Sequence, residues 1–231
     1  MGEQELAKLR REYAVGGLDE ADLTADPITM FLGWLRDARA AGMHEPNAMV
    51  VATAAADGKP SARLVLLKAL DAQGFVFFTN YGSRKAEELA ENPACALLFP
   101  WHDLERQVRV DGHATQLSSE ENAAYFGTRP RGSQLGAWAS PQSQVVASRA
   151  ELDARYDAVS ARFGADGDVP LPPGWGGFRV LPDAIEFWQG RTGRMHDRLR
   201  YRRIPAAEST PSEPAPSTST AAGWNIERLA P

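Results

Sequence analysis

The sequence lacks several features that define common protein classes. Cys95 is the only cysteine among 231 residues, so no disulfide can form within the chain and a reducing compartment is expected. No apolar run approaches the ~18 residues needed to cross a bilayer. The opening MGEQELAKLRREY does not resemble a signal peptide, and we expect a cytoplasmic protein. Cys95 stands in the apolar run NPACALLFP, which predicts a buried, unreactive thiol.

Motifs for nucleotides, metals and nucleophilic catalysis are also missing. No G-x-G-x-x-G follows a predicted strand and no G-x-x-x-x-G-K-[ST] is present, which removes the usual support for Rossmann and P-loop domains. The histidines form no H-x-H or H-E-x-x-H pair, which argues against a metal site. There is no G-x-S-x-G elbow for a serine nucleophile. The net charge of −5 argues against nonspecific nucleic-acid binding, because phosphate contacts would need local cations.

The residues that are present predict a mainly β, α+β protein. Apolar segments separated by turns such as ADGKP and DAQG predict strands at 47–55, 61–70, 75–80, 94–101, 106–117, 176–190 and 197–204, with a last strand or edge in 223–231. Turns this short join antiparallel neighbours, because a parallel pair needs a long crossover. About seven strands with helices between them favour one antiparallel barrel or sandwich.

Helices are expected between these strands. The patterns predict a short polar helix in residues 1–17, and helices at 28–41 after Pro27, at 84–92 with Ser83 as cap, at 118–126 with a capping box, and at 148–164. Gly and Pro break residues 125–144 into loop-like pieces. The Pro/Ser/Thr-rich segment 205–222 predicts a disordered insert. We expect an N-terminal helix or lid segment at 1–20 and a single domain at 21–231 that carries the insert.

Two segments place cations where a bound anion would explain them. Arg63 and Lys68 bracket LVLL, which is apolar on both faces as a central strand would be. These two side chains either mark the ends of that strand or bind an anion. Arg84 and Lys85 begin a helix, where they oppose the helix dipole. An anion between them would relieve this, and the alternative is a suboptimal helix start.

Two further segments are rich in hydrogen-bond donors. Residues 125–144 carry donors that suit a phosphate or heterocycle, although a polar surface loop is the default: Tyr125, Arg129, Arg131, Ser133, Gln142 and Ser143. Residues 187–203, FWQGRTGRMHDRLRYRR, gather six arginines around His196. Without metal ligands nearby, an anion or heterocycle site and a solvated strand remain open for this segment.

Together these segments resemble the pyridoxine/pyridoxamine 5′-phosphate oxidases. The similar motifs are RREY, EPNAMVVAT, RLVLLK, FFTNYGSRKAEEL, NPACALLFPWHDLERQVRVDG, YFGTRPRGSQLGAWASPQS, WGGFRVLP, IEFWQGRTGRMHDR and ERLAP, in the family's order. The resemblance implies an antiparallel split β-barrel and a homodimer with FMN at its interface. It also implies oxidation of pyridoxamine or pyridoxine 5′-phosphate to pyridoxal 5′-phosphate, with O2 as acceptor and release of H2O2. It implies neither a nucleic-acid nor a membrane partner.

The resemblance also assigns residues to ligands. It implies that the FMN site is formed by Arg63, Leu64, Val65, Leu66, Leu67, Lys68, Phe78, Thr79, Arg84, Lys85, Gln107, Trp188 and Arg198, with Gln142 and Ser143 from the other subunit. The substrate phosphate would be held by Lys68, Tyr125, Arg129 and Ser133. Arg194 and His196 would lie over the pyridine ring as catalytic residues, and the segment from Arg10 to Tyr13 would form a lid. Phe78 stands where some family members have tyrosine.

Two other functions are consistent with the same cation-rich segments. One is a split-barrel flavin reductase of a different heterocycle, and the other is a non-catalytic module that holds FMN or pyridoxal phosphate. The substrate set of Tyr125, Arg129 and Ser133 and the pair of Arg194 and His196 are intact, which favours the oxidase.

Overall fold

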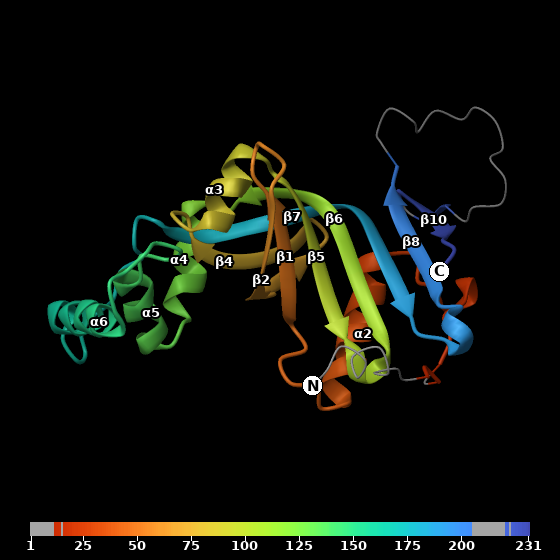
Figure 1. Cartoon of the computed structure of the whole chain (residues 1–231), viewed down its shortest axis with the longest axis horizontal. Helices are drawn as coiled ribbons and strands as arrows, with labels where there is room; N and C mark the ends of the chain where they lie inside the picture. The colour runs from red at the N-terminus through yellow and green to blue at the C-terminus, as the bar shows by residue number, and fades with distance from the viewer. Residues whose placement is uncertain (1–11, 15, 205–219, 222) are drawn as a thin grey trace, which may run out of the picture. The chain divides into compact units, whose positions relative to one another are not determined.

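The computed structural model describes residues 12–14, 16–204, 220–221 and 223–231 (Figure 1). Contacts divide the chain into two compact units, each assembled from separate segments. Unit 1 comprises Met1–Val50, Ala96–Asp111 and Pro182–Pro231, and unit 2 comprises Val51–Cys95 and Gly112–Leu181. The chain therefore passes between the units several times, and neither unit is a continuous stretch of sequence.

Within the described residues, ten strands form one sheet. They are β1 (Ala48–Ala54), β2 (Pro60–Leu66), β3 (Ala69–Asp71), β4 (Gly74–Asn80), β5 (Ala94–Trp101), β6 (Arg106–Gln116), β7 (Trp175–Gln189), β8 (Asp197–Arg203), β9 (Thr220–Ala221) and β10 (Trp224–Arg228). The order is β2-β1-β5-β6-β7-β8-β10-β9, and β4 pairs with β3 and β7. The pairs β3–β4, β4–β7, β7–β8, β8–β10 and β9–β10 are antiparallel. The predicted antiparallel α+β class is confirmed.

Several of the predicted helices are present, and some of them begin at side-chain caps. They are α2 (Pro27–Ala40), α3 (Arg84–Glu91), α4 (Ser119–Gly127), α5 (Arg131–Ala139) and α6 (Arg149–Phe163), with short 3-10 turns at Glu20–Asp22, His102–Leu104 and Thr192–Arg194. The Asp26 carboxylate accepts from the first turn of α2, and Pro27 fills the first position. Ser118 and Glu121 form the expected capping box of α4.

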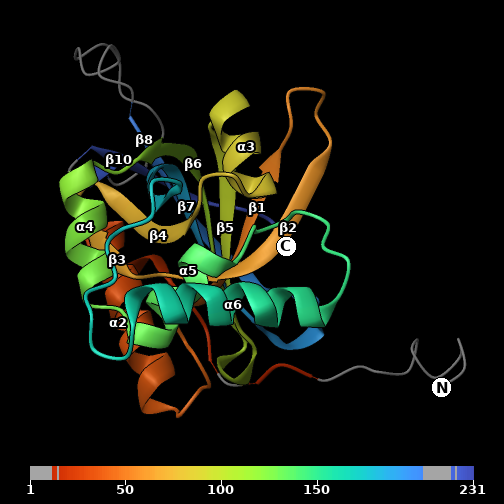
Figure 2. The same cartoon turned by 90° about the vertical axis from the view of Figure 1, so that its left-hand side faces the viewer.

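Each unit has an aromatic core. In unit 1, the ring of Phe31 lies 4.7 Å from Phe99, Trp34 lies 5.2 Å from Phe187, and Phe187 lies 5.7 Å from Tyr201. Unit 2 has a buried cluster to which α4 and α5 contribute. It consists of Phe126 from α4, Leu135 from α5, and Val169 and Trp175. Figure 2 shows α5 and α6 side by side in that unit.

Several local predictions are wrong. The predicted strand 61–70 is two strands, β2 and β3, with Leu67 and Lys68 between them. Its LVLL run is not central: β2 ends the strand order, and Leu64 is 69% exposed. The predicted loop at 125–144 contains α5, whose Leu135 and Ala139 are one helical turn apart and both buried. Cys95 is only partly buried.

The structure also differs from the predictions for two helices and for the segments near the two ends of the chain. Ser83 occupies the N-cap position of α3, but its side chain makes no capping bond. No residue of the amphipathic helix α6 is fully buried. Most of the predicted N-terminal helix lies outside the described residues, and residues 12–14 and 16–17 are not helical. Of the predicted disordered insert at 205–222, residues 205–219 and 222 lie outside the described part, whereas 220–221 form β9.

Candidate active site

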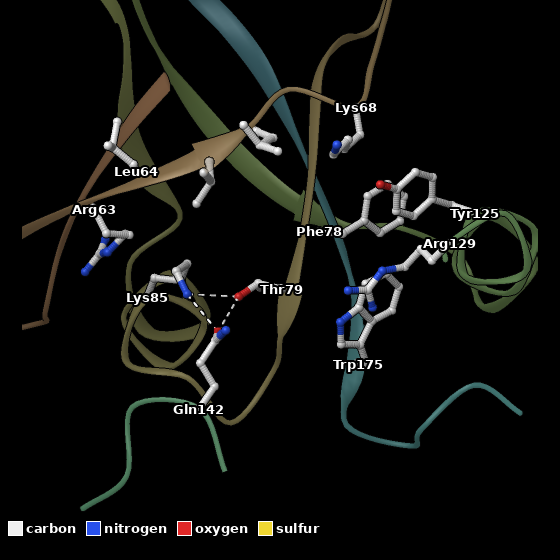
Figure 3. A pocket seen from close by; sticks show the side chains of 12 residues that line it. Arg63, Leu64, Lys68, Phe78, Thr79, Lys85, Tyr125, Arg129, Gln142 and Trp175 are labelled. Carbon is white, nitrogen blue, oxygen red and sulfur yellow. Dashed lines mark hydrogen bonds between the residues drawn. The ribbon is translucent and has the colours of Figure 1, made fainter. Parts of the chain in front are cut away.

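A cavity of about 300 Å³ lies within unit 2 (Figure 3). Strands β2 and β4, helices α3 and α4 and the loops next to them supply its walls. Its lining consists of Arg63, Leu64, Val65, Leu66, Lys68, Phe78, Thr79, Lys85, Tyr125, Arg129, Gln142 and Trp175. Trp175 is the member of this set to which sequence reasoning gave no role.

The lining is strongly cationic. Arg63, Lys68, Lys85 and Arg129 contribute to it, and no acidic side chain of the described residues does. Like charges gathered at a partly enclosed surface repel one another, and the repulsion is relieved when an anion enters. The cavity is therefore built for an anion.

The first part of the cavity, which we call the Lys85 end, consists of Arg63, Thr79, Lys85 and Gln142 (Figure 3). Lys85 is 8% exposed, and its Nζ donates to Thr79 Oγ1 at 2.9 Å and to Gln142 Oε1 at 3.0 Å. Both partners are neutral, so the ammonium charge stays uncompensated by them. Gln142 therefore reaches the cavity of its own chain, where the resemblance implied that it would come from the other subunit. Burial, and then the charge of Arg63, lower the pKa of Lys85 to about 8.

A buried carboxylate, Glu88 on α3, fixes Arg63 from outside the lining. It accepts from Thr53 Oγ1 and Ser61 Oγ at 2.5 Å each and lies 3.4 Å from Arg63 Nη2. Burial would raise the pKa of Glu88, but the hydrogen bonds from Ser61 and Thr53 and the pairing with Arg84 lower it to about 2. Arg84 Nε also binds Glu88, at 2.8 Å, and Arg84 does not line the cavity. Arg84, a predicted phosphate ligand, thus uses its Nε to bind Glu88 and leaves only its Nη groups for another partner.

The second part, the Arg129 end, consists of Lys68, Phe78, Tyr125, Arg129 and Trp175 (Figure 3). The ring of Phe78 stacks on Tyr125 at 3.8 Å and on Trp175 at 5.3 Å, with interplanar angles of 12° and 7°. The Arg129 guanidinium lies 4.6 Å from the Trp175 ring centroid. Its buried Nη1 has no hydrogen-bond partner within the described part of the chain, and burial lowers the pKa of Arg129. An unpaired buried donor in a cation-lined cavity is what an anion would satisfy.

The Trp175-Gly176-Gly177 sequence at the start of β7 makes this aromatic stack possible. Phe78 faces Gly177 across the β4–β7 pair, and a Cβ on Gly177 would lie 2.9 Å from the Phe78 ring. A Cβ on Gly176 would overlap the Tyr81 hydroxyl. Gly177 therefore leaves the space in which the Phe78 ring lies, and Gly176 leaves space for the Tyr81 hydroxyl. This W-G-G motif was the signal that could have pointed to Trp175.

Other predicted residues of unit 2 lie apart from the lining. Leu67 is buried, and the side chains of Ser133 and Ser143 are exposed. Ser143 has a left-handed backbone (φ 70°). The structure thus brings most of the predicted ligand-binding residues of unit 2 together in the cavity lining. Leu67, Ser133, Ser143 and Arg84 are the predicted residues of this unit that do not line it.

The remaining predicted residues belong to unit 1, where Tyr13, Trp188 and His196 form a ring cluster. Tyr13 lies 5.8 Å from Trp188 and 5.5 Å from His196, and Trp188 lies 4.6 Å from His196. The Arg191 backbone N–H donates to His196 Nδ1 at 3.1 Å. A neutral imidazole that accepts at Nδ1 carries its proton on Nε2, so His196 presents a donor there. The predicted lid residue Arg10 lies outside the described residues.

The other predicted members of unit 1 have different surroundings. Arg194 is exposed with a left-handed backbone (φ 61°), and Gln107 on β6 is half-buried. Arg198 binds Glu186 with two hydrogen bonds, at 2.9 and 3.1 Å, and Glu186 is 3% exposed. This pairing raises the pKa of Arg198. A flavin contact from Arg198 would have to use its remaining N–H groups.

The described residues contain neither a metal-binding cluster nor a membrane-spanning helix. No group of three or more His, Cys, Asp or Glu side chains there could hold a metal ion. Among the helices of the same residues, none has the length and hydropathy to span a membrane.

An antiparallel sheet with flanking helices is the fold of the split-barrel proteins, and the cation-lined, aromatic-walled cavity suits an anionic ligand. The family model of pyridoxamine 5′-phosphate oxidase matches residues 35–163, and that of the pyridoxine 5′-phosphate oxidase C-terminal dimerisation region matches residues 175–231. The chain belongs to the pyridoxine/pyridoxamine 5′-phosphate oxidase family, which confirms the resemblance read from the motifs.

Two curated relatives carry the name pyridoxine/pyridoxamine 5′-phosphate oxidase. The protein from a Nocardioides species is 55% identical over 231 residues, with all of both chains covered. The protein from Streptomyces avermitilis is 53% identical, with 97% of this chain and 96% of the relative covered.

Solved structures show the same fold. PhzG from Burkholderia lata, in complex with tetrahydrophenazine-1-carboxylic acid, matches with a TM-score of 0.80 and 30% identity over 93% of this chain and 98% of its own. A pyridoxamine 5′-phosphate oxidase-related, FMN-binding protein from Nostoc punctiforme has a TM-score of 0.67 at 15% identity, over 90% of this chain and 100% of its own. The second likeness is to the fold alone.

Proposed function

We propose that this protein is an FMN-dependent oxidase that converts pyridoxamine or pyridoxine 5′-phosphate to pyridoxal 5′-phosphate, with O2 as acceptor and H2O2 as product. The observation that carries the proposal is the buried Nη1 of Arg129, which has no partner among the described residues and lies in a cavity lined by Arg63, Lys68 and Lys85. The names of the full-length relatives support the same reaction.

The Lys85 end suits the phosphate of FMN. A dianion there would receive charge-assisted hydrogen bonds from Arg63 and Lys85, and the Thr79 hydroxyl and the Gln142 amide add neutral donors. FMN, when bound, would supply the two-electron acceptor for the substrate's C4′ carbon. The dimerisation match at 175–231 supports a homodimer, and the proposal places this cofactor at its interface.

The Arg129 end suits the phosphate of the substrate. Arg129 and Lys68 would neutralise it, and the Tyr125 hydroxyl would donate to it. In unit 1, His196 would present Nε2–H to the pyridine ring, and Arg194 would orient the substrate beside it. Tyr13, packed on Trp188 and His196, fits the predicted lid segment. A cytoplasmic location completes the proposal, in line with the single cysteine.

The test is a purification followed by a flavin spectrum and a peroxide assay under air with pyridoxamine 5′-phosphate and pyridoxine 5′-phosphate. We expect a yellow protein that oxidises one or both compounds. A protein that stays colourless with added FMN would contradict the cofactor assignment. FMN binding without peroxide would favour a split-barrel flavin reductase of another heterocycle or a non-catalytic FMN or pyridoxal-phosphate module.

A second candidate function rests on the likeness to PhzG. That protein was solved with a ring carboxylic acid, and an aromatic carboxylate also suits an arginine beside stacked rings. The same assay with tetrahydrophenazine-1-carboxylic acid in place of the phosphate substrates distinguishes the two functions.

A further inference from the structure

We propose that Trp175 is a positioning residue for substrate specificity: its indole face holds the Arg129 guanidinium in place without neutralising it, and so reserves that charge for the substrate's phosphate. This rests on the proposed function, in which Arg129 binds that phosphate. Trp175 itself makes no hydrogen bond to the ligand in this role.

The contact between the two side chains is a cation–π interaction. The Arg129 guanidinium carbon lies 4.6 Å from the Trp175 ring centroid and 5.7 Å from that of Phe126. Both distances fall within the ~6 Å over which a ring attracts a cation, and tryptophan is the strongest of the aromatic partners. Because a ring carries no net charge, Arg129 keeps its full positive charge while its position is fixed.

Arg63, in the same cavity, is held differently. Glu88 lies 3.4 Å from its Nη2 and partly compensates its charge. No carboxylate within the described residues pairs with Arg129, and its buried Nη1 is unpartnered. An ion pair would hold Arg129 as firmly but would compete with the phosphate for the same N–H groups.

Trp175 can act as a fixed platform because it is buried and packed between other rings. It is 7% exposed, lies parallel to Phe78 at 5.3 Å and meets Phe126 edge to face at 5.2 Å. Its backbone is paired with Asn80 of β4. A ring locked on these sides sets the plane on which the guanidinium rests.

The test compares two ligands on the FMN-loaded protein by isothermal titration calorimetry: pyridoxal 5′-phosphate and pyridoxal, which lacks the phosphate. Their affinity ratio isolates the contribution of the phosphate. Trp175→Leu should lower that ratio about 5- to 30-fold, the range expected for a desolvated cation–π contact. The affinity for pyridoxal and the flavin spectrum should stay unchanged.

Trp138→Leu is the matched control, because Trp138 also stacks with an arginine, Arg162 at 5.0 Å, and does not line the cavity. Its ratio should equal that of the unmodified protein. Trp175→Phe keeps a ring in the stack and should lower the ratio only about 2- to 5-fold, which provides a second variant if Trp175→Leu fails to fold.

The outcomes separate the proposals. If the unmodified protein prefers the phosphate but neither Trp175 variant lowers the ratio, the role of Trp175 is overturned and the proposed function stands. Equal loss of both ligands in the Trp175 variants would also overturn it, because that is the signature of a purely structural residue. If the unmodified protein binds both ligands equally, the proposed function and this inference fall together.

Discussion

Strand β8 in unit 1 and the cavity in unit 2 both gather arginines, but the partners of those arginines differ. On β8, Arg198 binds the buried Glu186, while Arg200 and Arg202 bind Glu227. In the cavity, Arg129 has a ring beside it in place of an acid. The most basic stretch of the sequence is therefore largely balanced by acids, whereas among the cations of the cavity the described residues pair only Arg63 with an acid. A ligand site is indicated by missing counter-charge more than by the number of cations.

The largest effect is expected where the balance on β8 is broken. Glu186→Gln removes the acidic partner of Arg198, at 2.9 Å, and one of two acidic partners of Arg109, at 3.3 Å. Arg198 is then left without a carboxylate, and Arg109 keeps only Asp111. Breaking a buried pair in this way costs about 3–5 kcal/mol. Urea denaturation should show that loss. Glu227→Gln, at a more exposed pair, is the control, and an equal loss there would contradict the importance of burial.

The next largest effect is expected in the cavity, where Arg129 has no acidic partner among the described residues. Arg129→Ala should weaken the binding of pyridoxal 5′-phosphate about 10- to 150-fold, the worth of one to two charge-assisted contacts, and should leave FMN affinity unchanged. Calorimetry on the FMN-loaded protein measures it. Arg202→Ala removes an arginine of β8 and should bind both ligands normally. A larger loss in Arg202→Ala than in Arg129→Ala would reverse the comparison.

A smaller effect should appear in the pH dependence of cofactor binding. The pKa of Lys85 is lowered to about 8, so its ammonium is present below that pH and is lost above it. A bound dianion favours the charged form, so FMN affinity should fall by up to about tenfold per pH unit as the pH rises from 8 towards the pKa of the complex. Quenching of flavin fluorescence between pH 7 and 9.5 measures this. Lys85→Met should bind FMN more weakly and lose this slope; an unchanged slope would assign the titration to another group.

The smallest effect is expected on the exposed side of β8. Arg202 is 44% exposed and binds Glu227 at 3.1 Å. Arg202→Ala should lower the free energy of unfolding by less than about 1 kcal/mol, because solvent screens such pairs. The same urea denaturation used for Glu186→Gln checks it, and a loss comparable with that variant would contradict the distinction between buried and exposed pairs.

Much of the fold and site follows from local patterns in the sequence. Pro27 and the capping box at Ser118 mark helix starts that the structure has. The motif resemblance named every cavity-lining residue except Trp175. It could not foresee that Glu88 would engage Arg84, because the same helix start suits an anion equally well until the neighbours of Glu88 are known.

What was missed depends on contacts between distant segments. Helix α5 forms in a Gly- and Pro-rich stretch because Leu135 packs with Val169 and Trp175 in a core that only the folded chain assembles. LVLL looks central by composition, yet β2 ends the strand order, and strand order is not encoded within the strand. The platform under Arg129 likewise requires a tryptophan from a different part of the sequence.

The close approach of Gly177 to Phe78 has a consequence for how this chain tolerates mutation. Gly177 lines no part of the cavity, and a methyl group there is the smallest addition that a side chain can make. That methyl would nevertheless press on the Phe78 ring and on Leu117, at 2.9 and 2.7 Å. Because Phe78 is stacked on Tyr125 and Trp175, the displacement would reach the residues that hold Arg129. We therefore expect Gly177 to be as sensitive to substitution as a residue of the cavity wall, although it does not line the cavity itself.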